Sequence, residues 1–141
     1  MKILIPVDGS EGAVHAVEHV IAGSARLKET PQLFLLNVQW KIAVGNVKLF
    51  INQDTIDDYY REQGLAALAA ARARLDAAGM PYTFHLSIGT PAEAIVQYAD
   101  EQQVDQIVLG ARGQNSLSTL LLGSVVDKVL RLARQPVLVV R

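Results

Sequence analysis

Short runs of almost uninterrupted apolar residues are the feature that most constrains the fold. Residues 2–8, 32–38, 105–111 and 136–141 each form such a run. This pattern is typical of strands that are buried on both faces of a parallel sheet, because neither face of the strand meets water. Residues 82–88 instead alternate polar and apolar side chains, which predicts a strand nearer an edge. We therefore expect five strands.

Helical patterns separate these runs. Ser10 is placed to cap a first helix, in which apolar residues recur at helical spacing. Its predicted buried face consists of Val14, Val17 and Ile21. A second helix over residues 54–78 would end at Gly79 in a left-handed conformation. Thr90, followed by proline and glutamate, predicts a capping box at the start of a third helix, and Gln135-Pro136 would end a fourth.

The alternation of strands and helices predicts an α/β fold. Right-handed crossovers would give a single doubly wound, five-stranded parallel sheet in the order 3-2-1-4-5, with helices on both faces. The 141 residues, half of them hydrophobic, suit one domain, residues 1–141.

Composition narrows the classes of partner. Thirteen basic and fourteen acidic side chains leave a net charge of -1, so we expect neither a nucleic-acid backbone nor an anionic membrane as a partner. The absence of cysteine excludes disulfides and thiolate sites and is compatible with a reducing compartment, so the expected location is cytoplasmic. No apolar stretch approaches the ~18 residues of a membrane span.

The ends of the first and fourth strands are the expected ligand site, because open α/β sheets bind ligands where the strand order reverses. Asp8 follows the first strand, where it could bond a ribose, an adenine amino group or a metal-bound water. It could equally cap the first helix beside Ser10. Both roles remain open on the sequence.

The stretch "GARGQNSLSTLLLGS", from Gly110 to Ser124, follows the fourth strand. Gly110 and Gly113 would let the backbone approach a ligand or take positive φ. Amide groups near Gly123 and Ser124 would lie at the positive end of the last helix, which suits phosphate. Arg112 could reach a phosphate or simply be solvated. The sequence lacks both a P-loop and a G-x-G-x-x-G motif.

This arrangement resembles the universal stress protein family, whose ATP-binding members carry G-x2-G-x9-G-[ST] after the fourth strand. Gly110, Gly113, Gly123 and Ser124 match every fixed position. The likeness extends over nearly the whole chain, through "ILIPVDGSEGA", "LLLGSVVDKVL" and "PVLVVR". It implies binding of ATP, ADP or AMP and a regulatory or stress-tolerance role. From its own chemistry, Asp8 could in addition hold Mg²⁺ indirectly on the nucleotide.

The resemblance also implies which residues bind the nucleotide. Those expected beside the base and ribose are Pro6, Val7, Asp8 and Val38. Those expected to line the phosphates are Gly110, Arg112, Gly113 and Gln114. Those expected to close the site are Gly123, Ser124 and Val125. The chain departs from the family at Gln114, where a histidine is frequent, and at Val126, where a small or hydroxyl residue is often found.

Two other functions stay open. No base paired with a nucleophile and no paired carboxylates stand out, so catalysis would amount to slow Mg-dependent nucleotide hydrolysis at most. The second alternative is a dimeric interaction module with a degenerate nucleotide pocket. "HAVEH" matches a helical zinc pattern through His15 and His19, but the remaining histidine, His85, belongs to the third strand, so we expect solvated surface histidines.

The predicted edge strand at residues 136–140 would invite pairing with another chain. We expect a homodimer through antiparallel pairing of this strand, as the resemblance also implies. The alternative is an edge covered by residues 40–54. That segment is long and apolar for a connection, and a lid, a subunit contact or a loop packed on its own domain would each explain it.

Overall fold

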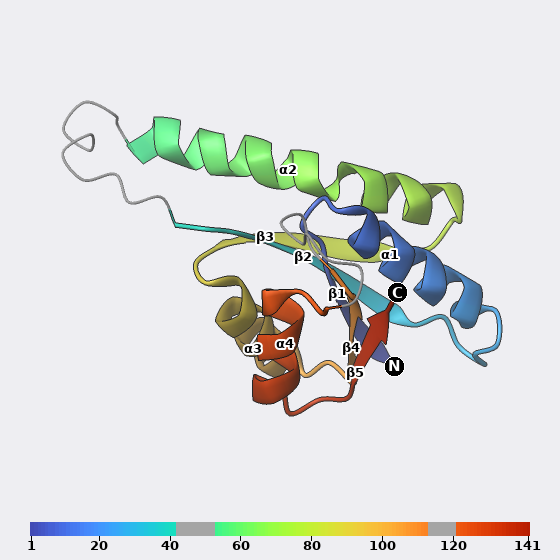
Figure 1. Ribbon diagram of the computed structural model, residues 1–141. Helices are drawn as coiled ribbons and strands as arrows, with labels where there is room; N and C mark the ends of the chain where they lie inside the picture. The colour runs from blue at the N-terminus through green and yellow to red at the C-terminus, as the bar shows by residue number, and fades with distance from the viewer. Residues whose placement is uncertain (42–52, 113–120) are drawn as a thin grey trace.

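The computed structural model describes residues 1–41, 53–112 and 121–141. Strands and helices alternate along the chain, as predicted (Figure 1). The strands are β1 (Lys2–Pro6), β2 (Gln32–Gln39), β3 (Tyr82–Ile88), β4 (Gln106–Gly110) and β5 (Val137–Val140). The helices are α1 (Glu11–Ser24), α2 (Gln53–Ala77), α3 (Pro91–Gln102) and α4 (Ser124–Leu132).

The sheet is parallel, and its order β3-β2-β1-β4-β5 confirms the predicted one. Helices α1 and α2 cover one face, while α3 and α4 cover the other (Figure 1). The ladder between β2 and β3 extends to Gln39 opposite Ile88. Among the described residues, the ladder between β1 and β4 ends with Leu4 opposite Ile107.

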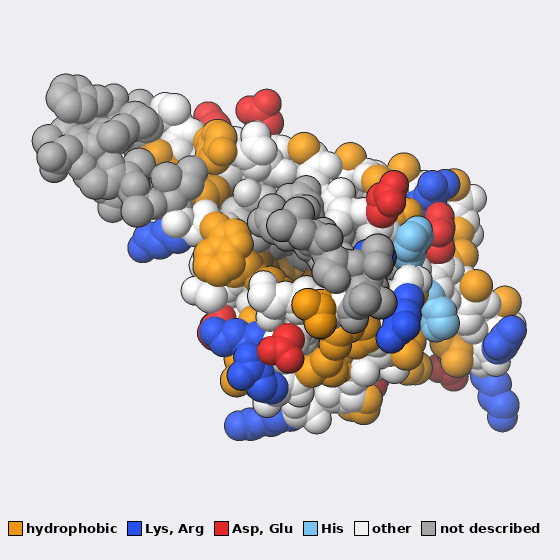
Figure 2. Space-filling model, viewed as in Figure 1, with side chains coloured by type: hydrophobic (Ala, Val, Ile, Leu, Met, Phe, Trp, Pro, Cys, Tyr) orange, Lys and Arg blue, Asp and Glu red, His pale blue; other side chains and the backbone are white. Residues whose placement is uncertain are grey.

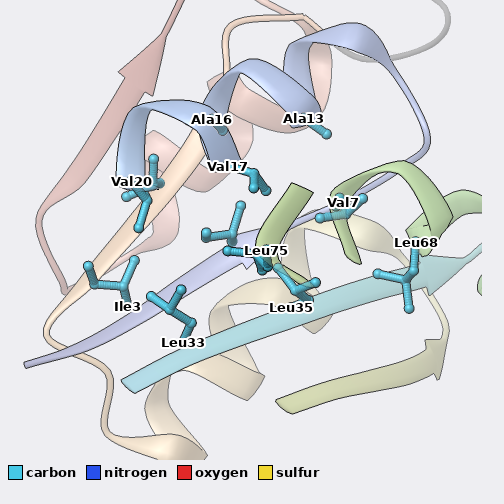
Figure 3. Packing of buried hydrophobic residues seen from close by; sticks show 13 residues of the cluster. Ile3, Val7, Ala13, Ala16, Val17, Val20, Leu33, Leu35, Leu68 and Leu75 are labelled. Atoms are coloured by element: carbon cyan, nitrogen blue, oxygen red, sulfur yellow. The ribbon is translucent and has the colours of Figure 1, made fainter. Parts of the chain in front are cut away.

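Two apolar layers hold the helices to the sheet. Ile3, Leu33 and Leu35 face α1 and α2, where they meet the buried side chains of Val17 and Leu75 (Figure 3). The intervening strand residues, Leu4, Phe34 and Leu36, face α3 and α4. Since successive side chains of a strand point to opposite faces, the uninterrupted apolar runs supply both layers.

The predicted buried face of α1 was partly wrong. Its buried residues are Ala13, Ala16, Val17 and Val20, whereas Val14 and Ile21 are only half-buried. The stripe is rotated so that Ala13 and Ala16 face the sheet together with Val17 and Val20.

Two of the predicted helix ends are confirmed by the structure, and one is wrong. Ser10 caps α1, since its Oγ accepts the amide of Ala13 at 3.3 Å, and Gly79 has the left-handed φ of 66°. The capping box predicted at Thr90 does not form, because its side chain makes no capping bond. Glu93, which would have completed it, pairs with Lys128 of α4 instead.

The segment 40–54 lies mostly outside the described residues, so its predicted roles stay predictions. Within the described part of the chain, no helix has both the length and the apolar character needed to cross a membrane.

Candidate functional site

The carboxyl ends of β1 and β4 lie side by side in the sheet. After β1 the chain passes to α1 on one face, and after β4 it passes to α4 on the other (Figure 1). This is the point at which the strand order reverses, where α/β sheets bind their ligands. The observed strand order therefore brings the ends of β1 and β4 together, as predicted. We call the ligand site predicted between them the crevice.

The end of β1 is held by a buried amide that the sequence analysis missed. Asn37 of β2 is 2% exposed, and its Nδ2 donates to the Val7 carbonyl at 2.8 Å. The Val7 amide in turn donates to the Leu36 carbonyl at 2.8 Å. A single asparagine inside the run "QLFLLNV" was the available signal, because a buried amide needs partners. Asn37 thereby fixes the backbone that leads to Asp8.

Asp8 stands at the exposed turn between β1 and α1. Its Oδ1 accepts the Ser10 amide at 3.0 Å and the Ser10 hydroxyl at 2.5 Å. Gly9 between them has a φ of 87°, which glycine adopts without strain. Ser10 is the residue that caps α1, so these bonds brace the capping residue and are not themselves a cap by Asp8. They hold the carboxylate beside the end of β1.

Gly110 has a role in packing that differs from the predicted one. Positive φ was one expectation, but among the described glycines only Gly9, Gly79 and Gly89 have it. A Cβ on Gly110 would overlap the Gly12 carbonyl and lie 2.9 Å from the Ala13 amide nitrogen. A Cβ on Gly12 would lie 2.5 Å from the Arg112 carbonyl oxygen. The two glycines let the backbone of α1 touch the end of β4.

Gly12 is thus a second residue that the sequence analysis missed. Its signal was a glycine in the first turn of a predicted helix, where glycine is otherwise unfavourable. Because Gly110 is required by this helix contact, its presence alone says nothing about a ligand. Evidence for ligand binding must therefore come from the other positions of the motif.

The beginning of α4 is tied to the end of β4. The Gly123 amide donates to the Ala111 carbonyl at 2.9 Å, and the Ala111 amide donates to the Val140 carbonyl of β5 at 2.7 Å. The Gly123 amide, one of the groups expected to bind phosphate, is therefore already bonded within the protein. The amides of Ser124 and Val125 precede the first bond within the helix, from Asp127 to the Gly123 carbonyl. They lie at the positive end of α4.

The remaining predicted residues are distributed along the same edge of the sheet. Pro6 and Val7 are buried, whereas Arg112 and Ser124 are exposed. Val38 is half-buried near the end of β2. Gly113 and Gln114 lie outside the described residues. The fold brings one set of predicted residues to the edge of the sheet where β1 and β4 end, with Val38 on the neighbouring strand. These residues are Pro6, Val7, Asp8, Gly110, Arg112, Gly123, Ser124 and Val125.

Histidines and carboxylates do not gather into a metal site in the described ranges, where no group of three or more potential ligands could hold an ion. His15 and His19 are exposed on α1, where histidine side chains appear at the surface (Figure 2). Glu18 between them pairs with Arg74 at 3.3 Å. His85 contacts Tyr98 from β3, which places it in a different element.

Two side chains outside the crevice have shifted pKa values. The hydrogen bond from Lys128 lowers the pKa of Glu93 below its ordinary value. Burial raises the pKa of Tyr98, since its ionised form loses water. Both lie on α3, away from the ends of β1 and β4.

Comparison with known proteins identifies the family. The model of the universal stress protein family matches residues 1–141. The universal stress protein MJ0531 of Methanocaldococcus jannaschii is 31% identical over 144 residues, covering 99% of this chain and 81% of that protein. YxiE of Bacillus subtilis, also a universal stress protein, is 30% identical over 99% of this chain and 98% of its own length.

Solved structures agree with these sequence relatives. The structure of MJ0577, another universal stress protein of Methanocaldococcus jannaschii, superposes with a TM-score of 0.83 at 31% identity. The match covers 99% of this chain and 94% of that one. Family match, sequence relatives and shared fold lead to one conclusion: the chain belongs to the universal stress protein family.

Proposed function

We propose that residues 1–141 form one cytoplasmic domain that binds ATP or a related adenine nucleotide between β1 and β4, and acts in regulation or stress tolerance. The observation that carries this proposal is the bond from the Gly123 amide to the Ala111 carbonyl. It fixes the positive end of α4 at the end of β4, the strand that neighbours β1, and a phosphate would be stabilised at such a helix end.

Each part of the nucleotide has residues of suitable chemistry. The amides of Ser124 and Val125 would donate hydrogen bonds to phosphate oxygens, and the family resemblance adds Gly113 and Gln114. Arg112 is exposed and carries a guanidinium that suits phosphate. Pro6, Val7 and Val38 would border the base, and Asp8 the ribose.

Magnesium would be held mainly by the phosphates, because the described residues contain no cluster of three metal-ligating side chains. Asp8 is the carboxylate placed to contact the ion through water. When bound, Mg²⁺ neutralises phosphate charge. The protein's own contribution is to orient the nucleotide and to keep Asp8 in its turn through Ser10.

Related structures support an adenine nucleotide. One universal stress protein was solved in complex with cAMP, at 24% identity and a TM-score of 0.73. Another, from Arabidopsis thaliana, was solved with AMP bound, at 20% identity and a TM-score of 0.70. Likeness at this level establishes the fold alone, and it indicates that this fold accommodates adenine nucleotides.

Thermal melting of nucleotide-free protein with and without MgATP tests the proposal. A ligand at ~100 times its dissociation constant adds about 2.7 kcal/mol to the free energy of unfolding, which corresponds to roughly 8 °C for a chain of this size. The Gly123→Val variant should lose this shift, because a branched side chain would crowd the amides of Ser124 and Val125. Gly123 has φ -63° and ψ 154°, which valine tolerates, so the variant should fold.

Two results would contradict nucleotide binding in the crevice. No shift of the wild-type melting temperature at millimolar MgATP would favour the interaction module with a degenerate pocket. An undiminished shift in Gly123→Val would place the phosphates elsewhere.

Slow hydrolysis is a separate alternative, for which Asp8→Ala should abolish Mg-dependent phosphate release. Persistent release in that variant would remove Asp8 from the chemistry.

The edge strand β5 supports a homodimer. All its residues are half-buried, and it is a terminal strand of the sheet. The Pro136 carbonyl accepts from Ile107 of β4, and the Val140 carbonyl accepts from the residue just after β4. By alternation the Val139 amide points away from β4. Val139→Pro removes that outward donor and spares the β4 ladder. Light scattering should then report a monomer, whereas an unchanged dimer would show that β5 is not the interface.

A further inference from the structure

A cavity of about 300 Å³ lies between the amino-terminal half of α2 and the ends of β2 and β3. It is distinct from the crevice, since none of its lining residues belongs to β1, β4 or α4. Its walls are mainly apolar, through Tyr60, Leu65, Phe84, Leu86 and Ile88, and the polar side chains of Gln39 and Ser87 also line it. Apolar cavities of this size with a few polar groups are typical of small-molecule sites.

The position of the cavity follows from the packing of α2. A Cβ on Gly64 would lie 2.6 Å from Leu86 Cδ2 and 3.2 Å from Asn37 Oδ1, so the helix touches the sheet at this glycine. Tyr60 and Arg61, about one turn earlier, line the cavity. The close contact at Gly64 thus adjoins the open space.

The walls are held in place by contacts of their own. Gln39 donates to Asn37 Oδ1 at 2.7 Å, and Asn37 is anchored to Val7. The Arg72 guanidinium stacks 4.3 Å from the centroid of the Phe84 ring. Tyr60 is only 7% exposed. A site whose walls are fixed before binding loses little entropy when a ligand enters.

The charged residues at the cavity are Arg61 and Asp57, one turn apart on α2. Asp57 already has a partner within the protein. Arg61 is exposed and forms neither an ion pair nor a side-chain hydrogen bond with any residue of 1–41, 53–112 or 121–141. The planar guanidinium of Arg61 carries parallel N–H donors that can bond to both oxygens of a carboxylate.

The surroundings favour a ligand with an apolar body. Trp40 is 63% exposed and Ile88 46% exposed near the ends of β2 and β3, where the Gly89 amide bonds to the Gln39 carbonyl. Hydrophobic side chains reach the surface beside the amino-terminal end of α2 (Figure 2). An aromatic or aliphatic group would cover this apolar surface while a carboxylate met the guanidinium.

We propose that this cavity is a second binding site, for a small aromatic or aliphatic carboxylate. The apolar body packs against Phe84 and Leu86, and the carboxylate bonds to Arg61. The inference goes beyond the nucleotide function and does not depend on it.

Isothermal titration calorimetry on the whole chain tests this with 2-naphthylacetate and its neutral analogue 2-naphthylacetamide. The acid should bind roughly tenfold more tightly than the amide, as a charge-assisted bond at a partly exposed site requires. Arg61→Gln should remove that difference by weakening the acid alone. Arg74→Gln, on the same helix but outside the cavity, is the matched control and should bind both probes as the wild type does.

Amide chemical shifts in NMR spectra provide the second measurement. Shifts caused by the acid should concentrate on residues 57–65 and 84–88, and Leu65→Trp should remove them by filling the cavity. No binding of the acid at millimolar concentration, equal binding by Arg61→Gln, or shifts concentrated at β1 and β4 would overturn the proposal. Thermal melting of the same variants with and without MgATP distinguishes the two sites, since Arg61→Gln should keep the rise in melting temperature that the nucleotide causes.

Discussion

Replacing Gly110 by alanine tests whether this motif glycine serves the packing of α1. The new Cβ would overlap the Gly12 carbonyl and come within 2.9 Å of the Ala13 amide nitrogen. Both neighbours are backbone, so no flexible side chain can move aside, and α1 or β4 must shift. Overpacking of this kind costs about 1–3 kcal/mol, and rigid backbone on both sides favours the upper value. At roughly 3 °C per kcal/mol for a chain of this length, the melting temperature should fall by roughly 9 °C.

Gly23 lies in α1, the helix whose backbone Gly110 contacts, and it provides a matched control. A Cβ at Gly23 would meet nothing within 4 Å, so Gly23→Ala should raise the free energy of unfolding by about 0.5 kcal/mol, since alanine favours helices. Differential scanning calorimetry and urea denaturation, both without nucleotide, measure the two variants. If Gly110→Ala melted with the wild type yet lost its MgATP shift, the glycine would serve the ligand and the packing explanation would be refuted.

Two further predictions concern the buried amide and the pair between α3 and α4. Asn37→Ala should lower the free energy of unfolding by about 1–3 kcal/mol, because it leaves the buried Val7 carbonyl without its 2.8 Å donor; a urea midpoint equal to that of the wild type would contradict this. Glu93 should titrate below 4.5 by NMR, because Lys128 lowers its pKa. Its contribution to stability should therefore be present above the unfolded-state pKa and disappear as the pH falls through the lower folded-state pKa. Lys128→Gln should return the Glu93 midpoint toward 4.5, and an unchanged midpoint would show that this pair is not the cause.

The strand order, and with it the point at which that order reverses, could be predicted from the sequence. Buried strands of a parallel sheet leave a local signature, since a strand with both faces buried must be apolar throughout. Right-handed crossovers then restrict the order of strands. The positions of Asp8 and Gly123 relative to that order were predictable for the same reason, because each follows a recognisable strand or precedes a recognisable helix.

The tertiary structure decided the contacts between elements that are distant in the sequence. The contact between Gly12 and Gly110, the bond from Asn37 to Val7, and the use of the Gly123 amide by Ala111 all join separate elements. The sequence by itself determined which segments are strands and helices, because hydrophobic periodicity and caps act within a few residues. The distance between helix and sheet decides which N–H groups form hydrogen bonds within the protein. It also decides which glycines contact the backbone of another element. That distance is set by the packing of all the side chains in the layer.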